Sequence, residues 1–142
     1  MNVKLNLTKN HILSVSIGIL YLWFGTLKFF PDQSPAEDLA KNTISALTFN
    51  QISPNVSIIL LAIWETLVGV LLITNIYRRV AIFLALVHMV LTFTPLFIIP
   101  EQVFIDMPFQ LTLVGQYIIK NIVIIVALIS LYKLPERKPK LH

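Results

Sequence analysis

The sequence predicts an all-α integral membrane protein: a four-helix bundle with a short amphipathic outer helix between spans one and two. The first observation is composition, because 13% of the 142 residues are charged and 56% are apolar. A soluble domain carries about 25% charged residues. The second is that the apolar residues gather in four runs near the roughly 20 residues that a helix needs to cross a bilayer. With a mean hydropathy of +0.80, we expect a chain surrounded mainly by lipid.

The predicted spans form one domain over residues 1–142 and cover 12–30, 56–76, 80–99 and 111–132. The first apolar run is longer than the 7–15 residues of a signal peptide and no A-x-A site follows it, so we expect it to be retained. The short turn "NIYRR" predicts that spans two and three form an antiparallel hairpin. Pro95 predicts a bend near the outer end of span three.

Basic residues flank one side of these spans. Eight of the 11 Lys and Arg residues lie there, whereas the opposite loops hold one lysine and five acids. The eight are Lys4, Lys9, Arg78, Arg79, Lys133, Arg137, Lys138 and Lys140; the others are Lys41, Asp32, Glu37, Asp38, Glu101 and Asp106. By the positive-inside rule, both termini and the basic tail at 133–142 face the cytoplasm. We expect a multi-pass protein of a bacterial inner membrane.

The two outer loops differ in kind. In the first, Ser34, Pro35 and Glu37 have the spacing of a capping box that starts a helix. Its expected apolar face is Ala36, Leu39, Ala40, Thr43, Ile44 and Leu47, opposite Glu37, Asp38, Lys41, Asn42 and Ser45. This helix either lies on the outer membrane surface or caps the bundle, the alternative being an ordinary solvent-facing loop helix. The second loop, "PEQVFIDMPF", is expected to fold back into the interface.

Composition also argues against several classes of site. Lys and Arg do not alternate with aromatic residues in any run, which argues against nucleic-acid binding. The chain has no cysteine, which excludes disulfides, thiolate metal sites and a CxxC pair. The three histidines have no HxxxH or ExxH spacing, so no metal site is expected.

Ionisable side chains at membrane depth are the candidate functional residues. Counting 1.5 Å per residue places Glu65 and Lys120 about 14 Å inside the predicted spans, with His88 near the middle of its own. Each costs about 2.5–3.5 kcal/mol to insert. Lys28, near the outer end of span one, is long enough to point either way, and we expect it to point inward over the deeper charges. Gln116 and Asn121 complete the polar set, with Trp64, Thr92 and Tyr117 as secondary members.

Two interpretations of this set remain open. In the first, Glu65 and Lys120 form a buried ion pair that fixes the register of the helices. In the second, the set lines an outward-facing polar pocket. There Glu65 and His88 would exchange protons, while Lys120 or Lys28 would bind an anion or polarise a carbonyl.

Four segments carry a family resemblance: "YLWFGTLKFFPDQSPAE", "WETLVGVLLI", "RRVAIFLALVHMVLTFTPLF" and "GQYIIKNIVIIVAL". In their order and spacing the chain resembles the DoxX-like superfamily of small four-helix bacterial membrane proteins, in particular its YkgB-type branch. The resemblance places the family's first-span lysine at Lys28, its glutamate at Glu65 and its last lysine at Lys120. The family often has an acid after that lysine, where this chain has Asn121.

The resemblance implies a redox role. Named members are associated with a thiosulfate:quinone oxidoreductase subunit, with oxidative or reactive-chlorine stress and with membrane redox complexes. A quinone is therefore the implied cofactor, with a redox partner subunit as electron donor, or a homo-oligomer as the assembly. The sequence leaves open whether the chain is an enzyme. The alternatives are a non-catalytic assembly or structural subunit and a small transporter.

Overall fold

The computed structural model describes residues 2–34 and 36–133, with side chains from Asn10 onward. Pro35 and residues 134–142 of the predicted basic tail lie outside the described residues. Within the described part, four segments are long and apolar enough to cross a membrane: Asn10–Leu27, Pro54–Thr74, Arg78–Ile98 and Leu113–Tyr132. The protein is an all-α, multi-pass membrane bundle, as the composition predicted.

The secondary structure follows the predicted spans closely, with differences at their ends. The elements are α1 (Asn2–Leu27), α2 (Glu37–Leu47), α3 (Pro54–Thr74), α4 (Arg78–Leu91), α5 (Pro95–Ile98), α6 (Pro100–Val103), β1 (Phe104–Asp106), β2 (Gln110–Leu111) and α7 (Leu113–Tyr132). The first span ends at Leu27 instead of residue 30. The third is broken between α4 and α5 directly before Pro95, because proline cannot donate a backbone hydrogen bond and clashes with the preceding turn.

Glycines allow α1 and α3 to pack closely along their length. Added Cβ atoms at Gly18 and Gly25 of α1 would lie 2.8 Å from Ile73 and from the backbone nitrogen of Thr66, respectively. At Gly69 of α3, such an atom would lie 2.6 Å from the backbone nitrogen of Leu22. Small residues of this kind let two helix backbones approach closely inside a bilayer. The same close approach brings the end of α1 against the middle of α3.

The bundle is closed at the end where α3 meets α4, here called the Arg78 end. Asn75 and Tyr77 adopt left-handed backbone conformations in the turn between these helices, so the predicted antiparallel hairpin is confirmed. The Arg78 guanidinium donates a 3.0 Å hydrogen bond to the carbonyl of Leu131, which ties the start of α4 to the end of α7. The buried core around Leu72 and Leu128 lies toward this end.

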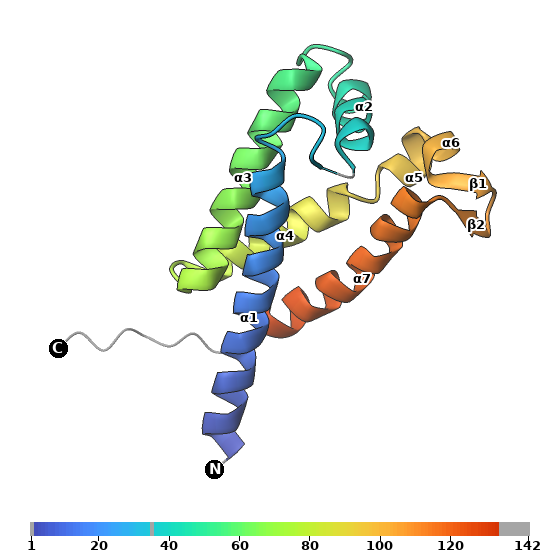
Figure 1. Ribbon diagram of the computed structural model, residues 1–142. Helices are drawn as coiled ribbons and strands as arrows, with labels where there is room; N and C mark the ends of the chain where they lie inside the picture. Colours follow the sequence, from blue (N-terminus) through green and yellow to red (C-terminus); the bar gives the residue numbers. More distant parts are fainter. Residues whose placement is uncertain (1, 35, 134–142) are drawn as a thin grey trace.

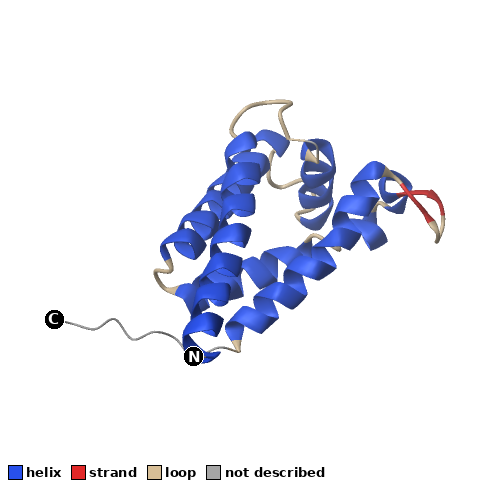
Figure 2. Cartoon of the chain, turned by 60° about the horizontal axis from the view of Figure 1, so that its bottom comes forward, coloured by secondary structure: helices blue, strands red, loops and turns tan. Residues whose placement is uncertain are grey.

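At the opposite end, here called the α2 end, the helices diverge. Figures 1 and 2 show α7 leaving the side of α1 as it runs from its C-terminal to its N-terminal end, with α2 lying beyond the resulting space. Beyond α5, the second loop forms α6 and a small antiparallel hairpin of β1 and β2, which the sequence did not predict. Val103 packs into a small core with Leu39 and Ile118, whereas Ile105 and Phe109 are exposed.

The start of α2 differs from the predicted capping box. The N-cap residue is Ala36, without a side-chain cap, so the assignment of Ser34 as the cap was wrong. Asp32 has a φ of 63°, and the turn it forms directs its backbone N–H to the Glu37 carboxylate at 3.0 Å. The other oxygen of Glu37 pairs with Lys41 at 2.6 Å. Glu37 was expected on the polar face, yet it is buried and holds α2 to the preceding turn.

We predict that this attachment is lost in acid. The hydrogen bond from Lys41 lowers the pKa of Glu37 below its ordinary value. The stabilisation that the ionised carboxylate gives to the attachment of α2 is therefore complete at pH values above the ordinary pKa. It is lost as the pH falls through the lowered pKa of the folded protein. The chain has no cysteine, so a spin label on Asp38→Cys would report on α2 alone. Label mobility should rise between pH 7 and pH 3. Glu37→Gln should show raised mobility at both, and an unchanged wild-type spectrum would contradict the prediction.

Candidate functional site

A large cavity lies between the helices at the α2 end. Its volume is about 510 Å³, and its walls come from α1, α2, α3, α4 and α7. That volume lies within the roughly 300–1,000 Å³ of small-molecule sites. The whole predicted apolar face of α2 lines it: Ala36, Leu39, Ala40, Thr43, Ile44 and Leu47. The amphipathic helix therefore caps the bundle, because its apolar face covers this cavity.

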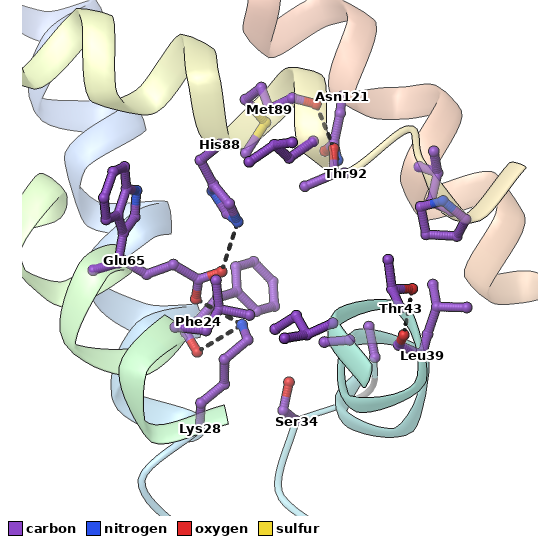
Figure 3. Close-up of a pocket in the computed structure, with 18 of the residues that line it drawn as sticks. Phe24, Lys28, Ser34, Leu39, Thr43, Glu65, His88, Met89, Thr92 and Asn121 are labelled. Atoms are coloured by element: carbon purple, nitrogen blue, oxygen red, sulfur yellow. Dashed lines mark hydrogen bonds and ion pairs between the residues drawn. The ribbon is translucent and has the colours of Figure 1, made fainter. Parts of the chain in front are cut away.

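One wall of the cavity carries an ion pair. The Lys28 ammonium lies 2.6 Å from Oε2 of Glu65, and both side chains are at least nine-tenths buried. Lys28 also donates to the carbonyl of Phe24 at 3.3 Å. The close packing at Gly25, where an added Cβ would lie 2.9 Å from that of Glu65, explains how the end of α1 reaches the middle of α3. Lys28 points inward, as predicted (Figure 3).

His88 extends this wall toward the core. Its Nε2 lies 3.3 Å from Oε1 of Glu65, and its Nδ1 lies 3.2 Å from the hydroxyl of Tyr21. That hydroxyl donates to the carbonyl of Ala85 at 3.0 Å. A continuous chain of polar contacts thus runs from Lys28 through Glu65 and His88 to Tyr21. Tyr21 was not among the predicted site residues, although it lies seven residues, about two helical turns, before Lys28, which directly follows α1.

A second polar group lies across the cavity from this chain. The Asn121 amide donates to Thr92 Oγ1 at 2.9 Å, and Thr92 donates to the carbonyl of Met89 at 2.6 Å. Ser34 also lines the cavity and is 9% exposed. Among the described residues its hydroxyl has no hydrogen-bond partner. Figure 3 places Ser34 near Lys28, and Asn121 with Thr92 on the far side. The cavity therefore has polar groups at two positions and a mainly apolar interior.

The structure does not form the predicted ion pair between Glu65 and Lys120. Lys120 is exposed, with its ammonium 5.3 Å from the centre of the Tyr117 ring, a distance at which a cation and an aromatic face attract each other. Because α7 turns Asn121 toward the cavity, Lys120 one residue earlier points about 100° away. Gln116 is also exposed. In the described residues, the cationic partner of Glu65 at ion-pair distance is Lys28, with His88 on the other oxygen.

Several apolar side chains of the cavity wall are exposed. Among them are Leu20 of α1, Leu60 of α3 and Leu91 of α4, which are 44%, 54% and 51% exposed. Trp64 and Tyr117 also line the cavity and are partly exposed. The described residues contain no group of three or more His, Cys, Asp or Glu that could hold a metal ion.

Comparison with known proteins identifies the family. No match was found among curated proteins or among solved structures. The model of the DoxX family matches residues 11–99, which include Lys28, Glu65 and His88 together with α2. This match covers more than half of the sequence. The four-span chain with its Lys28–Glu65–His88 wall therefore belongs to the DoxX family.

Proposed function

We propose that this protein is a redox-linked membrane component whose cavity binds an apolar carbonyl compound of the quinone class. The observation that carries the proposal is a mainly apolar cavity between the spans, with one wall formed by Lys28, Glu65 and His88. A quinone needs an apolar slot, a hydrogen-bond donor at each carbonyl and a source of protons when it is reduced. The cavity has residues of each kind.

The donors are placed at two separated positions. Lys28 uses two of its three N–H groups on Glu65 and Phe24, so one remains for a ligand, and the unpartnered Ser34 hydroxyl lies near it. The Asn121 amide, on the other side, has a second N–H beyond the one given to Thr92. A carbonyl at either end of a flat apolar molecule would meet a donor. Quinone chemistry supplies the electron-accepting group, while these residues bind and orient it.

The remaining parts of the proposal concern the cell. We assign electron delivery to a redox partner subunit, and thiol chemistry to a partner or substrate, since the chain has no cysteine. The excess of basic residues at the Arg78 end supports an orientation in a bacterial inner membrane with cytoplasmic termini. The α2 end and its cavity would then face outward. A role in the stress response and membership of the YkgB-type branch belong to the same proposal.

Tryptophan fluorescence tests the binding site directly. Trp64 lines the cavity, whereas Trp23 is 65% exposed and lies outside it. In lipid nanodiscs, a short-chain benzoquinone should quench the Trp23→Phe protein, which retains Trp64, with a saturable component. The matched Trp64→Phe protein should show only the linear quenching that comes from quinone dissolved in the lipid. Equal, non-saturating quenching of both proteins would contradict the proposal.

One observation favours a second candidate, a non-catalytic structural subunit. Both oxygens of Glu65 and both ring nitrogens of His88 already have partners within the protein, so the polar wall is complete without a ligand. In that case Lys28 and Glu65 serve only to fix α1 against α3. A folded Lys28→Met/Glu65→Gln protein would then retain full biological activity, whereas the quinone proposal expects it to lose saturable quenching.

A further inference from the structure

The direction in which the Tyr21 hydroxyl donates is linked to which nitrogen of His88 carries a proton. The carbonyl of Ala85 can only accept, so the 3.0 Å contact between them requires the Tyr21 hydroxyl to donate. A hydroxyl has one hydrogen. The 3.2 Å contact between this hydroxyl and Nδ1 of His88 must then be made by a proton on Nδ1.

That assignment has a consequence on the other side of the ring. If Nδ1 of a neutral imidazole is protonated, Nε2 has only a lone pair. Nε2 lies 3.3 Å from Oε1 of Glu65, which in a carboxylate is also an acceptor. Two acceptors at this distance in a buried site repel each other. A further proton between the two atoms turns this contact into a hydrogen bond.

We infer that the Glu65–His88 pair is a binding site for one exchangeable proton, with Tyr21 as the residue that positions it. In the loaded state, the pair holds this extra proton and Tyr21 donates to Ala85. In the unloaded state, the Tyr21 hydroxyl turns to donate to Nδ1 of His88, and Nε2–H donates to the Glu65 carboxylate. The two states differ by one proton and by the direction of one hydroxyl.

The surrounding charges are compatible with such a site. From the turn directly after α1, Lys28 compensates Glu65 at 2.6 Å, so the loaded cluster carries a single net positive charge. From α7, Tyr117 lines the cavity and the exposed Lys120 lies over its ring. From α2, the acidic Glu37 is paired with Lys41.

This site deepens the proposed function, and its use rests on that proposal. Glu65 and His88 both line the cavity, so the stored proton lies where a quinone that receives electrons from a partner would need one. Transfer of the proton between Nε2 and Oε1 to the ligand would leave the cluster neutral, with Lys28 still paired to Glu65. The imidazole proton that remains on Nδ1 then exchanges to Nε2 as the Tyr21 hydroxyl turns, which gives the unloaded state. Tyr21 would act through His88, without contact to the ligand.

Nitrogen-15 NMR of labelled histidine tests the inference without any ligand, so failure of quinone binding would not affect it. In a His11→Gln/His142→Gln protein in nanodiscs at neutral pH, the His88 spectrum should show a protonated Nδ1. Tyr21→Phe should abolish that signal and leave the neutral form protonated on Nε2. Tyr77→Phe, at an exposed tyrosine remote from the cavity, should change nothing.

Two results would overturn the inference. One is a His88 that stays neutral and protonated only on Nε2 at every pH of a titration of the protein that retains Tyr21, because the loaded state would then never form. The other is a protonated Nδ1 that survives Tyr21→Phe. If Tyr21→Phe does not fold, the spectrum of the protein with Tyr21 decides the matter, because it reports directly which nitrogen carries the proton.

Discussion

Replacing Lys28 with methionine should destabilise the protein by about 3 kcal/mol. Removing one partner of a buried ion pair leaves the other charge uncompensated, which typically costs about 3–5 kcal/mol. Glu65 is buried and lies 2.6 Å from Lys28, and it can offset part of that cost by taking up a proton. Thermal or denaturant unfolding in detergent, with the oligomeric state held constant, measures the change.

Lys120→Met is the matched control for this experiment. It is the same substitution within another span, but Lys120 is exposed and its ammonium lies over Tyr117 instead of near a carboxylate. We expect a change below about 1 kcal/mol, in the range of a cation–π contact. The double variant Lys28→Met/Glu65→Gln should recover most of the stability lost in Lys28→Met. A larger loss in Lys120→Met than in Lys28→Met would show that Glu65 pairs with Lys120 after all.

Gly69→Ala should destabilise the contact between α1 and α3, although alanine is the better helix former. Its Cβ would lie 2.6 Å from the backbone nitrogen of Leu22 and 2.9 Å from the carbonyl oxygen of Gly18. These backbone atoms cannot rotate away, so the helices must separate. Overpacking of this kind costs about 1–3 kcal/mol, which exceeds the gain of up to about 1 kcal/mol in helix propensity. We expect a net loss of about 1 kcal/mol, the middle of the overpacking range less the gain in helix propensity.

The larger Gly69→Val should reduce the yield of folded protein further, because it adds two more carbons at the same contact. Unfolding in detergent measures the first variant, and size-exclusion chromatography of the membrane extract measures the second. Ser16→Thr adds one carbon to an exposed position of α1 and should leave stability unchanged. Equal stabilities of Gly69→Ala and the wild type would contradict the close backbone contact.

The sequence by itself was enough to predict the four spans and the apolar face of α2. Apolar runs must be long enough to cross the bilayer, so the hydrophobic length alone determines them. A period of 3.6 residues likewise assigns Leu39, Thr43 and Leu47 to one face, and that face lines the cavity. Pro95 marks the break in the third span because its effect on a helix is local.

The partners of the charged residues were decided by the tertiary structure. Counting residues gives the depth of Glu65 and Lys120 but not the direction in which α7 turns, and a single position around that helix moves a side chain by about 100°. Lys28 becomes the partner of Glu65 because the glycine contacts bring α1 close to α3. Tyr21 reaches the carbonyl of Ala85 because α4 approaches α1. Depth and amphipathicity are properties of one helix and can be read along the chain. An ion pair or a shared proton requires two helices to meet, so only their packing determines it.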